Sequence, residues 1–140
     1  MTIVIHHNPD CGTSRTVLRI IEAAGYKPTV IEYLKEGWTR PQLLALFAAA
    51  GLTPRSALRK TRSPAEALGL LDEALPDDVL LDHMLAHPIL VNRPIVCTAN
   101  GVRLCRPAEA VLELLDQWPA GPFSKDDGGL LIDAEGNRVA

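Results

Sequence analysis

The chain has 140 residues, enough for one domain that buries a hydrophobic core without metal or disulfide support. Its formal net charge of -3 excludes the strongly basic surface of a nucleic-acid-binding domain and a polybasic membrane anchor. No apolar run approaches the length of a membrane span, and no basic leader precedes the first apolar run. We therefore expect a cytoplasmic protein with neither nucleic acid nor membrane as a partner.

The first part of the chain predicts a βαβ unit, with bounds of about 2–33. Residues 2–6 form an apolar, β-rich run, residues 13–24 carry apolar side chains at helical spacing, and residues 29–33 form a second apolar run. This order favours a right-handed crossover between parallel strands. The loop after the first strand would then lie where open α/β sheets usually bind their ligands.

The segment from 39 to 88 predicts only helices. The first begins after Thr39, has Pro41 just inside it and ends at Gly51. Further helices are predicted over residues 54–60, from the capping box Ser63-Pro64-Ala65-Glu66, and from Pro76 through Leu85. These helices would form an insertion between two halves of a sheet.

The other half of the sheet is predicted at residues 94–118. Two apolar runs flank Asn100-Gly101, a strong hairpin signal, and a last helix follows Arg106-Pro107. The remainder, residues 121–140, is polar and glycine-rich, and a short apolar run at 130–132 predicts a strand there. We predict that this segment is a mobile tail.

The element order resembles the plan of a thioredoxin-like fold, an α/β fold with a mixed sheet, here with a helical insertion between the βαβ and ββα halves. We expect a single domain over residues 1–140. In such folds the bond before the proline that opens the third strand is usually cis and lies opposite the active cysteine. We therefore predict a cis Arg93–Pro94 bond, although an ordinary X–Pro bond is cis only about one time in twenty.

Cys11 stands at the junction of the first predicted strand and helix. A helix start exposes unpaired N–H groups and the positive end of the peptide dipole, which stabilise a thiolate and also bind oxyanions, here at Gly12 and Thr13. A neighbouring His7 and the hydroxyls of Thr13 and Ser14 would add to this effect. Lowering the cysteine pKa from about 8.5 by about two units would make the thiolate the majority form. The alternative for Cys11 is an inert, buried cysteine, and the alternative for His7 is a structural histidine.

The cysteine count favours a reducing compartment. Cys11, Cys97 and Cys105 make an odd number without a close C-x-x-C pair, which fits neither a secreted disulfide framework nor a zinc site. We assign no catalytic role to Cys97 or Cys105, and we expect Cys105 to face the core or the far side of the sheet. His83 and His87 lie four apart on a predicted helix but have no further ligands nearby, so we predict no metal site.

Arg59, Arg93 and Arg106 each follow an apolar run at the junction of two elements, and the last two precede a proline. A guanidinium group suits a tetrahedral oxyanion because its forked donors bind two oxygens at once and keep their charge. The alternative is that these arginines are surface charges with salt-bridge partners. Together with a thiol, they predict an oxyanion site.

Four sequence blocks closely resemble the glutaredoxin-linked arsenate reductases, over about residues 2–125. The blocks are His7-Asn8-Pro9-Asp10-Cys11-Gly12-Thr13-Ser14-Arg15, Leu58-Arg59-Lys60, His87-Pro88-Ile89-Leu90-Val91-Asn92-Arg93-Pro94-Ile95-Val96 and Arg103-Leu104-Cys105-Arg106-Pro107. Asp10 before the cysteine would oppose thiolate formation if it pointed inward, so we expect it to face solvent.

The resemblance implies a mechanism. The Cys11 thiolate would attack arsenate held by the three arginines, glutathione would attack the adduct, and glutaredoxin would reduce the intermediate before hydrolysis releases arsenite. His7 would help to lower the thiol pKa and Ser14 would hydrogen-bond the thiolate. Glutathione is thus a co-substrate, glutaredoxin is the electron donor and no cofactor stays bound.

Other functions are compatible with the same plan. Regulators that bind RNA polymerase share the architecture, but many carry a second cysteine where this chain has Ser14. A general glutathione-dependent thiol oxidoreductase would not need the arginines. Some arsenate-reductase-like proteins keep the cysteine without a known activity on arsenate. Ser14 and the complete set of arginines favour the arsenate reductase.

Overall fold

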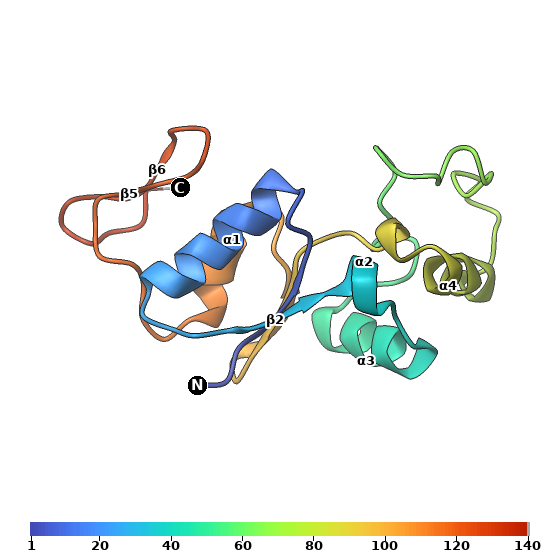
Figure 1. Cartoon of the computed structure of the whole chain (residues 1–140), viewed down its shortest axis with the longest axis horizontal. Helices are drawn as coiled ribbons and strands as arrows, with labels where there is room; N and C mark the ends of the chain where they lie inside the picture. The colour runs from blue at the N-terminus through green and yellow to red at the C-terminus, as the bar shows by residue number, and fades with distance from the viewer. Residues whose placement is uncertain (140) are drawn as a thin grey trace. The chain divides into compact units, whose positions relative to one another are not determined.

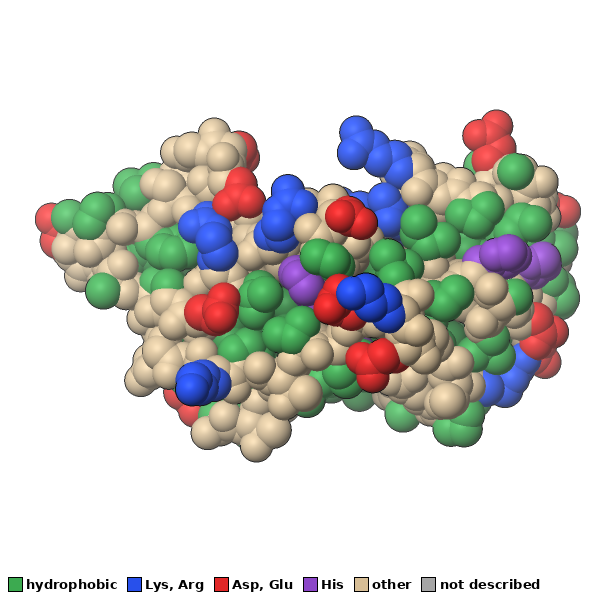
Figure 2. Space-filling model, viewed as in Figure 1, with side chains coloured by type: hydrophobic (Ala, Val, Ile, Leu, Met, Phe, Trp, Pro, Cys, Tyr) green, Lys and Arg blue, Asp and Glu red, His purple; other side chains and the backbone are tan. Residues whose placement is uncertain are grey.

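The computed structural model describes residues 1–139, which form two compact units. Unit 1 comprises Met1–Glu32 and the chain from Arg93 onward, and unit 2 comprises Tyr33–Asn92. The helical insertion expected at 39–88 falls within unit 2. Each helix among the described residues is too short or too polar to cross a membrane. On the face shown in Figure 2, basic and acidic side chains lie among one another.

Unit 1 is built on the mixed sheet that the sequence predicts. Its strands are β1 (Val4–His7), β2 (Thr29–Glu32), β3 (Ile95–Thr98) and β4 (Gly101–Leu104), in the order β2-β1-β3-β4. β1 pairs parallel with β2 and antiparallel with β3, and β3 pairs antiparallel with β4 across the predicted turn (Figure 1). The α/β fold class and the parallel βαβ start are thus confirmed.

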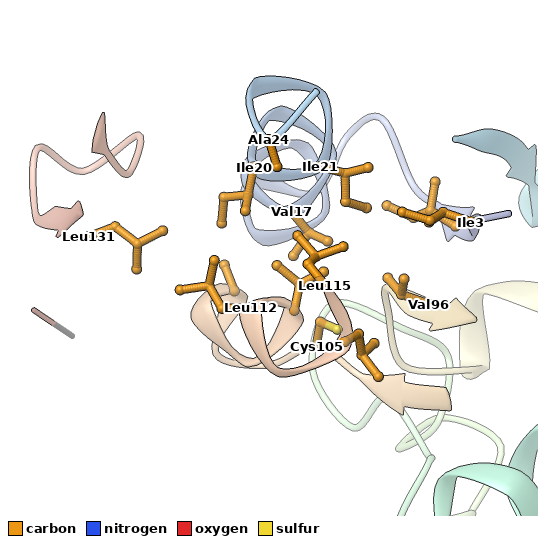
Figure 3. Close-up of a cluster of buried hydrophobic side chains, with 14 of the residues drawn as sticks. Ile3, Val17, Ile20, Ile21, Ala24, Val96, Cys105, Leu112, Leu115 and Leu131 are labelled. Atoms are coloured by element: carbon orange, nitrogen blue, oxygen red, sulfur yellow. The ribbon is translucent and has the colours of Figure 1, made fainter. Parts of the chain in front are cut away.

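The core of unit 1 lies between the sheet, helix α1 (Gly12–Ala23) and the 3-10 helix η2 (Ala108–Leu114). Figure 3 shows Val17, Ile20 and Ile21 of α1 facing Leu112 and its neighbours. The last helix ends at Leu114, before the end of the half that is predicted over residues 94–118. The Leu114 carbonyl accepts hydrogen bonds from the Thr98 hydroxyl and the Asn100 amide, and this competition from the hairpin ends the helix.

Residues 121–139, which the sequence predicts as a mobile tail, pack against the core of unit 1. They form two short strands, β5 (Phe123–Ser124) and β6 (Leu130–Ile132), the second at the expected position. Leu131 and Ile132 are fully buried in the core of unit 1, where Figure 3 shows Leu131. Arg19 of α1 also donates to the Ser124 carbonyl. Two apolar side chains in the core therefore hold the polar segment in place.

Unit 2 contains the helices α2 (Tyr33–Glu36), α3 (Arg40–Ala50) and α4 (Asp77–Ala86) and the 3-10 turn η1 (Pro88–Leu90). α3 begins as predicted, because Thr39 and Gln42 form a reciprocal capping box, and ends at Gly51 with a left-handed backbone, φ +69°. α4 begins directly after Pro76, also as predicted. Local sequence signals, a Thr39 cap for α3 and Pro76 for α4, therefore located both long helices.

The two other predicted helices of unit 2, at 54–60 and from Ser63, are wrong. Leu58 forms an antiparallel bridge with Val91, and the Arg59 N–H donates to the Leu90 carbonyl, so this part of the chain is extended. The Ser63 hydroxyl donates to the Arg59 carbonyl and accepts from the nearby Ala65 N–H, and only turns follow. Pairing with a distant segment outweighs the local helical preference here.

Candidate active site

Cys11 lies at the end of a short loop between β1 and α1 in unit 1. The Asn8 side chain accepts from the Asp10 N–H at 2.9 Å, and the Asn8 carbonyl accepts from the Cys11 N–H at 3.1 Å. Cys11 is the N-cap residue of α1, and its side chain makes no capping hydrogen bond. Asp10 is exposed, as expected. The turn therefore places a thiol, rather than a hydroxyl or carboxylate, at the positive end of α1.

His7 and Ser14 form a buried pair beneath this loop. His7 Nδ1 lies 2.7 Å from Ser14 Oγ, which also accepts from the Asn8 N–H at 3.1 Å. Burial lowers the pKa of His7, and the charge of Glu32 opposes this shift. The Ser14 hydroxyl is therefore occupied in fixing the loop, and the effect of Ser14 on the thiolate comes from its backbone N–H, which lowers the pKa of Cys11.

Two of the three predicted arginines contact the thiol. Arg106, which follows β4, places Nη1 3.7 Å from Cys11 Sγ and 3.3 Å from the Arg93 carbonyl. Arg93, just before β3, hydrogen-bonds the thiol through its own side chain. The Arg93–Pro94 peptide bond is cis, which confirms that prediction. Both guanidinium groups thus reach Cys11 from the ends of neighbouring strands.

The net effect on the Cys11 thiol is a lowered pKa. Burial by itself raises the pKa, since the side chain of Cys11 is almost inaccessible to solvent. The Ser14 N–H, the charge and hydrogen bond of Arg93, and the charge of Arg106 outweigh that penalty. The site therefore stabilises a thiolate beside two cations, an arrangement suited to nucleophilic attack on an anionic centre.

The remaining predicted substrate-binding residues lie in different parts of the chain. Gly12 and Thr13 form the first turn of α1 and line a cavity of about 300 Å³. Arg59 belongs to unit 2, where it is buried and its Nε donates to the Thr61 carbonyl at 3.0 Å. Its assignment to the site with Cys11 stays a prediction.

The other two thiols differ from Cys11. Burial raises the pKa of Cys97, and it raises that of the fully buried Cys105 to about 12. Cys105 thus lies in the core, as expected. Among residues 1–139 no group of three or more His, Cys, Asp or Glu side chains is arranged to hold a metal ion.

Sequence reasoning missed the role of Asn8. Its side chain is 3% exposed and makes the turn that delivers Cys11. An Asn-Pro pair is a recognised turn signal, so this role was visible in principle. The cavity beside Gly12 was not visible, because residues 125–127 at the far end of the chain form one of its walls.

Comparison with known proteins identifies the family. Residues 6–114 match the ArsC family. The chain belongs to the ArsC family. It is 72% identical to the arsenate reductase ArsI2 of Synechocystis sp., over 98% of both chains, and 50% identical to an arsenate reductase of Escherichia coli K12, over 98% of this chain and 97% of the other.

A solved ArsC-related structure shows the same fold. The arsenate reductase from Vibrio cholerae superimposes with a TM-score of 0.77 at 40% identity, covering 82% of this chain and 98% of its own. The thioredoxin-like fold and the family expected from the four sequence blocks are confirmed. This ArsC chain extends beyond the family match, and its segment after residue 114 includes β5 and β6.

Proposed function

We propose that this ArsC protein reduces arsenate to arsenite with Cys11 as the nucleophile. The observation that carries the proposal is the meeting of Arg93 and Arg106 at the Cys11 thiol, at the start of α1. The full-length similarity to proteins named arsenate reductases, at 72% and 50% identity, supports it. The three free thiols fit a reducing compartment, and we place the protein in the cytoplasm on that ground.

The first step is attack of the thiolate on arsenate. A sulfur–arsenic bond forms, and one arsenate oxygen takes up protons and leaves as water. Arg93 and Arg106 offset the negative charge of the oxyanion as it approaches an anionic sulfur, and Arg59 is proposed as a third donor. The free N–H groups in the first turn of α1 provide further donors for the oxygens. Arsenic is still pentavalent at this stage.

Two external thiols then supply the electrons. Glutathione replaces a second oxygen on arsenic and forms a glutathione–arsenic bond, with release of water. The glutaredoxin thiolate attacks the glutathione sulfur, a mixed disulfide leaves, and the bonding electron pair stays on arsenic, which becomes trivalent. Hydrolysis of the remaining sulfur–arsenic bond releases arsenite and restores Cys11. The scheme needs no bound cofactor.

The state of the three cysteines supports the use of external thiols. Burial raises the pKa of Cys97 and Cys105, and Cys11 alone has a lowered pKa. A dithiol mechanism would need a second ionised thiol near Cys11. Ser14 occupies the position where a C-x-x-C motif would place it, and its hydroxyl binds His7 and the Asn8 N–H.

The test is arsenite production by the purified protein with arsenate, glutathione, glutaredoxin and a reductant supply. We expect turnover that requires both glutaredoxin and Cys11, with Cys97→Ser as a matched control that keeps its activity. A parallel assay with thioredoxin in place of glutaredoxin should give little arsenite. If Cys11 reacts with thiol reagents but arsenate is not reduced, the proposal is wrong, and a regulatory protein partner becomes the better explanation.

A further inference from the structure

The sequence block around the thiol ends in Arg15, which has no role in the mechanism described so far. Arg15 lies in the first turns of α1, shortly after Cys11, and it is exposed. Its backbone N–H donates to the Cys11 carbonyl at 3.0 Å, and its Nη1 donates to the Pro9 carbonyl at 2.8 Å. One residue of the helix therefore binds the chain on both sides of the cysteine.

The Pro9 carbonyl belongs to the central peptide of the turn before Cys11. Asn8 to Cys11 form a four-residue turn, which the bond from the Cys11 N–H to the Asn8 carbonyl closes. The orientation of the peptide between the second and third residues distinguishes a type I turn from a type II turn. Here that peptide joins Pro9 and Asp10. Its carbonyl accepts from Arg15 and its N–H donates to the Asn8 side chain, so side chains fix both of its polar groups.

The two side-chain bonds differ in what they connect. The Asn8 bond lies within the turn, since an Asn side chain commonly binds the backbone two residues further on. The Arg15 bond connects the turn to α1. The start of α1 is where the Ser14 N–H lowers the pKa of Cys11. A bond that holds the turn against the helix therefore keeps the sulfur close to this N–H.

The charge of Arg15 does not account for its position. The charges of Arg93 and Arg106 lower the pKa of Cys11, and Arg15 is not among the groups that shift it. The Arg15 charge acts on His7, whose pKa it lowers. An effect of Arg15 on the thiol would therefore pass through the backbone of the turn.

We propose that Arg15 is a positioning residue, which holds the turn before Cys11 against the start of α1 through its bond to the Pro9 carbonyl. This inference rests on the proposed function, because it assigns Arg15 to the activation of the same thiol. Without the bond, the Pro9–Asp10 peptide rotates more freely and the sulfur spends less time beside its donors. The thiolate then forms at higher pH, and attack on arsenate is slower, since misplacement by about 1 Å can cost about 100-fold in rate.

The test compares Arg15→Leu with Arg15→Lys. Both variants keep the backbone N–H that binds the Cys11 carbonyl, so the comparison isolates the side-chain bond. Arg15→Leu should raise the pH midpoint of Cys11 alkylation and lower kcat for arsenate by about tenfold, the scale of one charge-assisted hydrogen bond. Arg15→Lys keeps a donor and should recover most of both losses. The difference between the variants should persist at about 1 M salt, which screens exposed charges.

Arg19→Leu is the matched control. Arg19 is also exposed on α1, one turn further along, and it donates to a backbone carbonyl of another segment, that of Ser124. Arg19→Leu should lower the free energy of unfolding, measured with denaturant, and leave the Cys11 midpoint unchanged.

Several results would overturn the proposal. They are a parent-like Cys11 midpoint in Arg15→Leu, an equal shift in Arg19→Leu, and no recovery in Arg15→Lys. A higher KM for arsenate with a parent-like midpoint would also overturn it, because Arg15 would then bind the substrate. Since alkylation is read without arsenate, a failure of this proposal is distinguishable from a failure of the protein to reduce arsenate.

Discussion

The regions around Cys11 and Cys105 show how one fold makes one thiol reactive and another inert. Both side chains are buried in unit 1, and burial raises the pKa of each. At Cys11 the Ser14 N–H and two guanidinium groups reverse the shift, whereas at Cys105 the charge of Arg103 is too weak to do so. Burial therefore does not decide reactivity here.

Proximity in sequence to an arginine also does not decide which thiol is activated. Cys105 is the neighbour of Arg106, yet the Arg106 guanidinium reaches across to Cys11. The backbone after β4 points the arginine toward the helix start and the cysteine into the core. The activated thiol is the one that combines a helix N-terminus with cations from two strand ends.

The largest expected effect on turnover comes from replacing Cys11, and replacement of Cys105 provides the comparison. Cys11→Ser should reduce arsenate turnover at least about 1,000-fold, the scale on which removal of a nucleophile acts. Cys105→Ala should leave turnover unchanged and lower only the free energy of unfolding, because it removes a core side chain. Turnover and denaturant unfolding of both variants check this, and substantial activity in Cys11→Ser would contradict the assignment.

Removing a guanidinium group from the site should bring the pKa of Cys11 closer to the raised pKa of Cys105. Arg106→Leu or Arg93→Leu should raise the Cys11 pKa and lower kcat/KM for arsenate by about 100-fold, as loss of an oxyanion donor does. Arg103→Leu is the control, since Arg103 on β4 pairs with Glu113 of η2 and is not among the groups that shift the Cys11 pKa. An unchanged Cys11 titration in both site variants would show that these cations do not activate the thiol.

Arg59 tests whether unit 2 contributes to the site. If Arg59 binds the oxyanion, Arg59→Leu should raise the KM for arsenate by about tenfold and alter the Cys11 pKa less than Arg106→Leu does. Lys60→Leu, at the exposed neighbouring position, serves as the control. The same KM in both variants would remove Arg59 from the substrate-binding set.

A smaller effect is expected at Ser14. Ser14→Ala keeps the backbone N–H that lowers the Cys11 pKa but removes the hydroxyl that holds His7 and the Asn8 N–H. Turnover should fall only a few-fold, and the Cys11 pKa should rise by less than in Arg106→Leu. A larger rise than in Arg106→Leu would mean that the hydroxyl itself stabilises the thiolate.

The parts of the fold that sequence predicts are those with local causes. The Thr39 cap, the Asn100-Gly101 turn and the apolar stripe of α1 each act within a few residues, and each led to the observed element. The missed parts depend on distant partners. Leu58 pairs with Val91, and Leu131 enters a core made by residues about 100 positions earlier.

The candidate site also has features that the sequence predicts and features that it does not. Cys11, Arg93 and Arg106 were predictable because Cys11 and Arg106 follow β1 and β4 and Arg93 precedes the antiparallel β3, which brings all three to one edge of the sheet. It was not predictable that the Ser14 backbone N–H, and not the Ser14 hydroxyl, lowers the Cys11 pKa. The hydroxyl is engaged by His7, and that contact depends on where His7 lies. The cavity lined by Lys125 could not be predicted from the sequence, because its wall depends on how the C-terminal strands pack.

The most direct test of the central claim is the pH dependence of alkylation at Cys11, followed by mass spectrometry of the native protein. The account predicts a midpoint below the pKa of about 8.5 of a free cysteine, a higher midpoint in Arg106→Leu, and no modification of Cys105 in the same samples. A Cys11 midpoint at or above the free value, unaffected by Arg106→Leu, would contradict it.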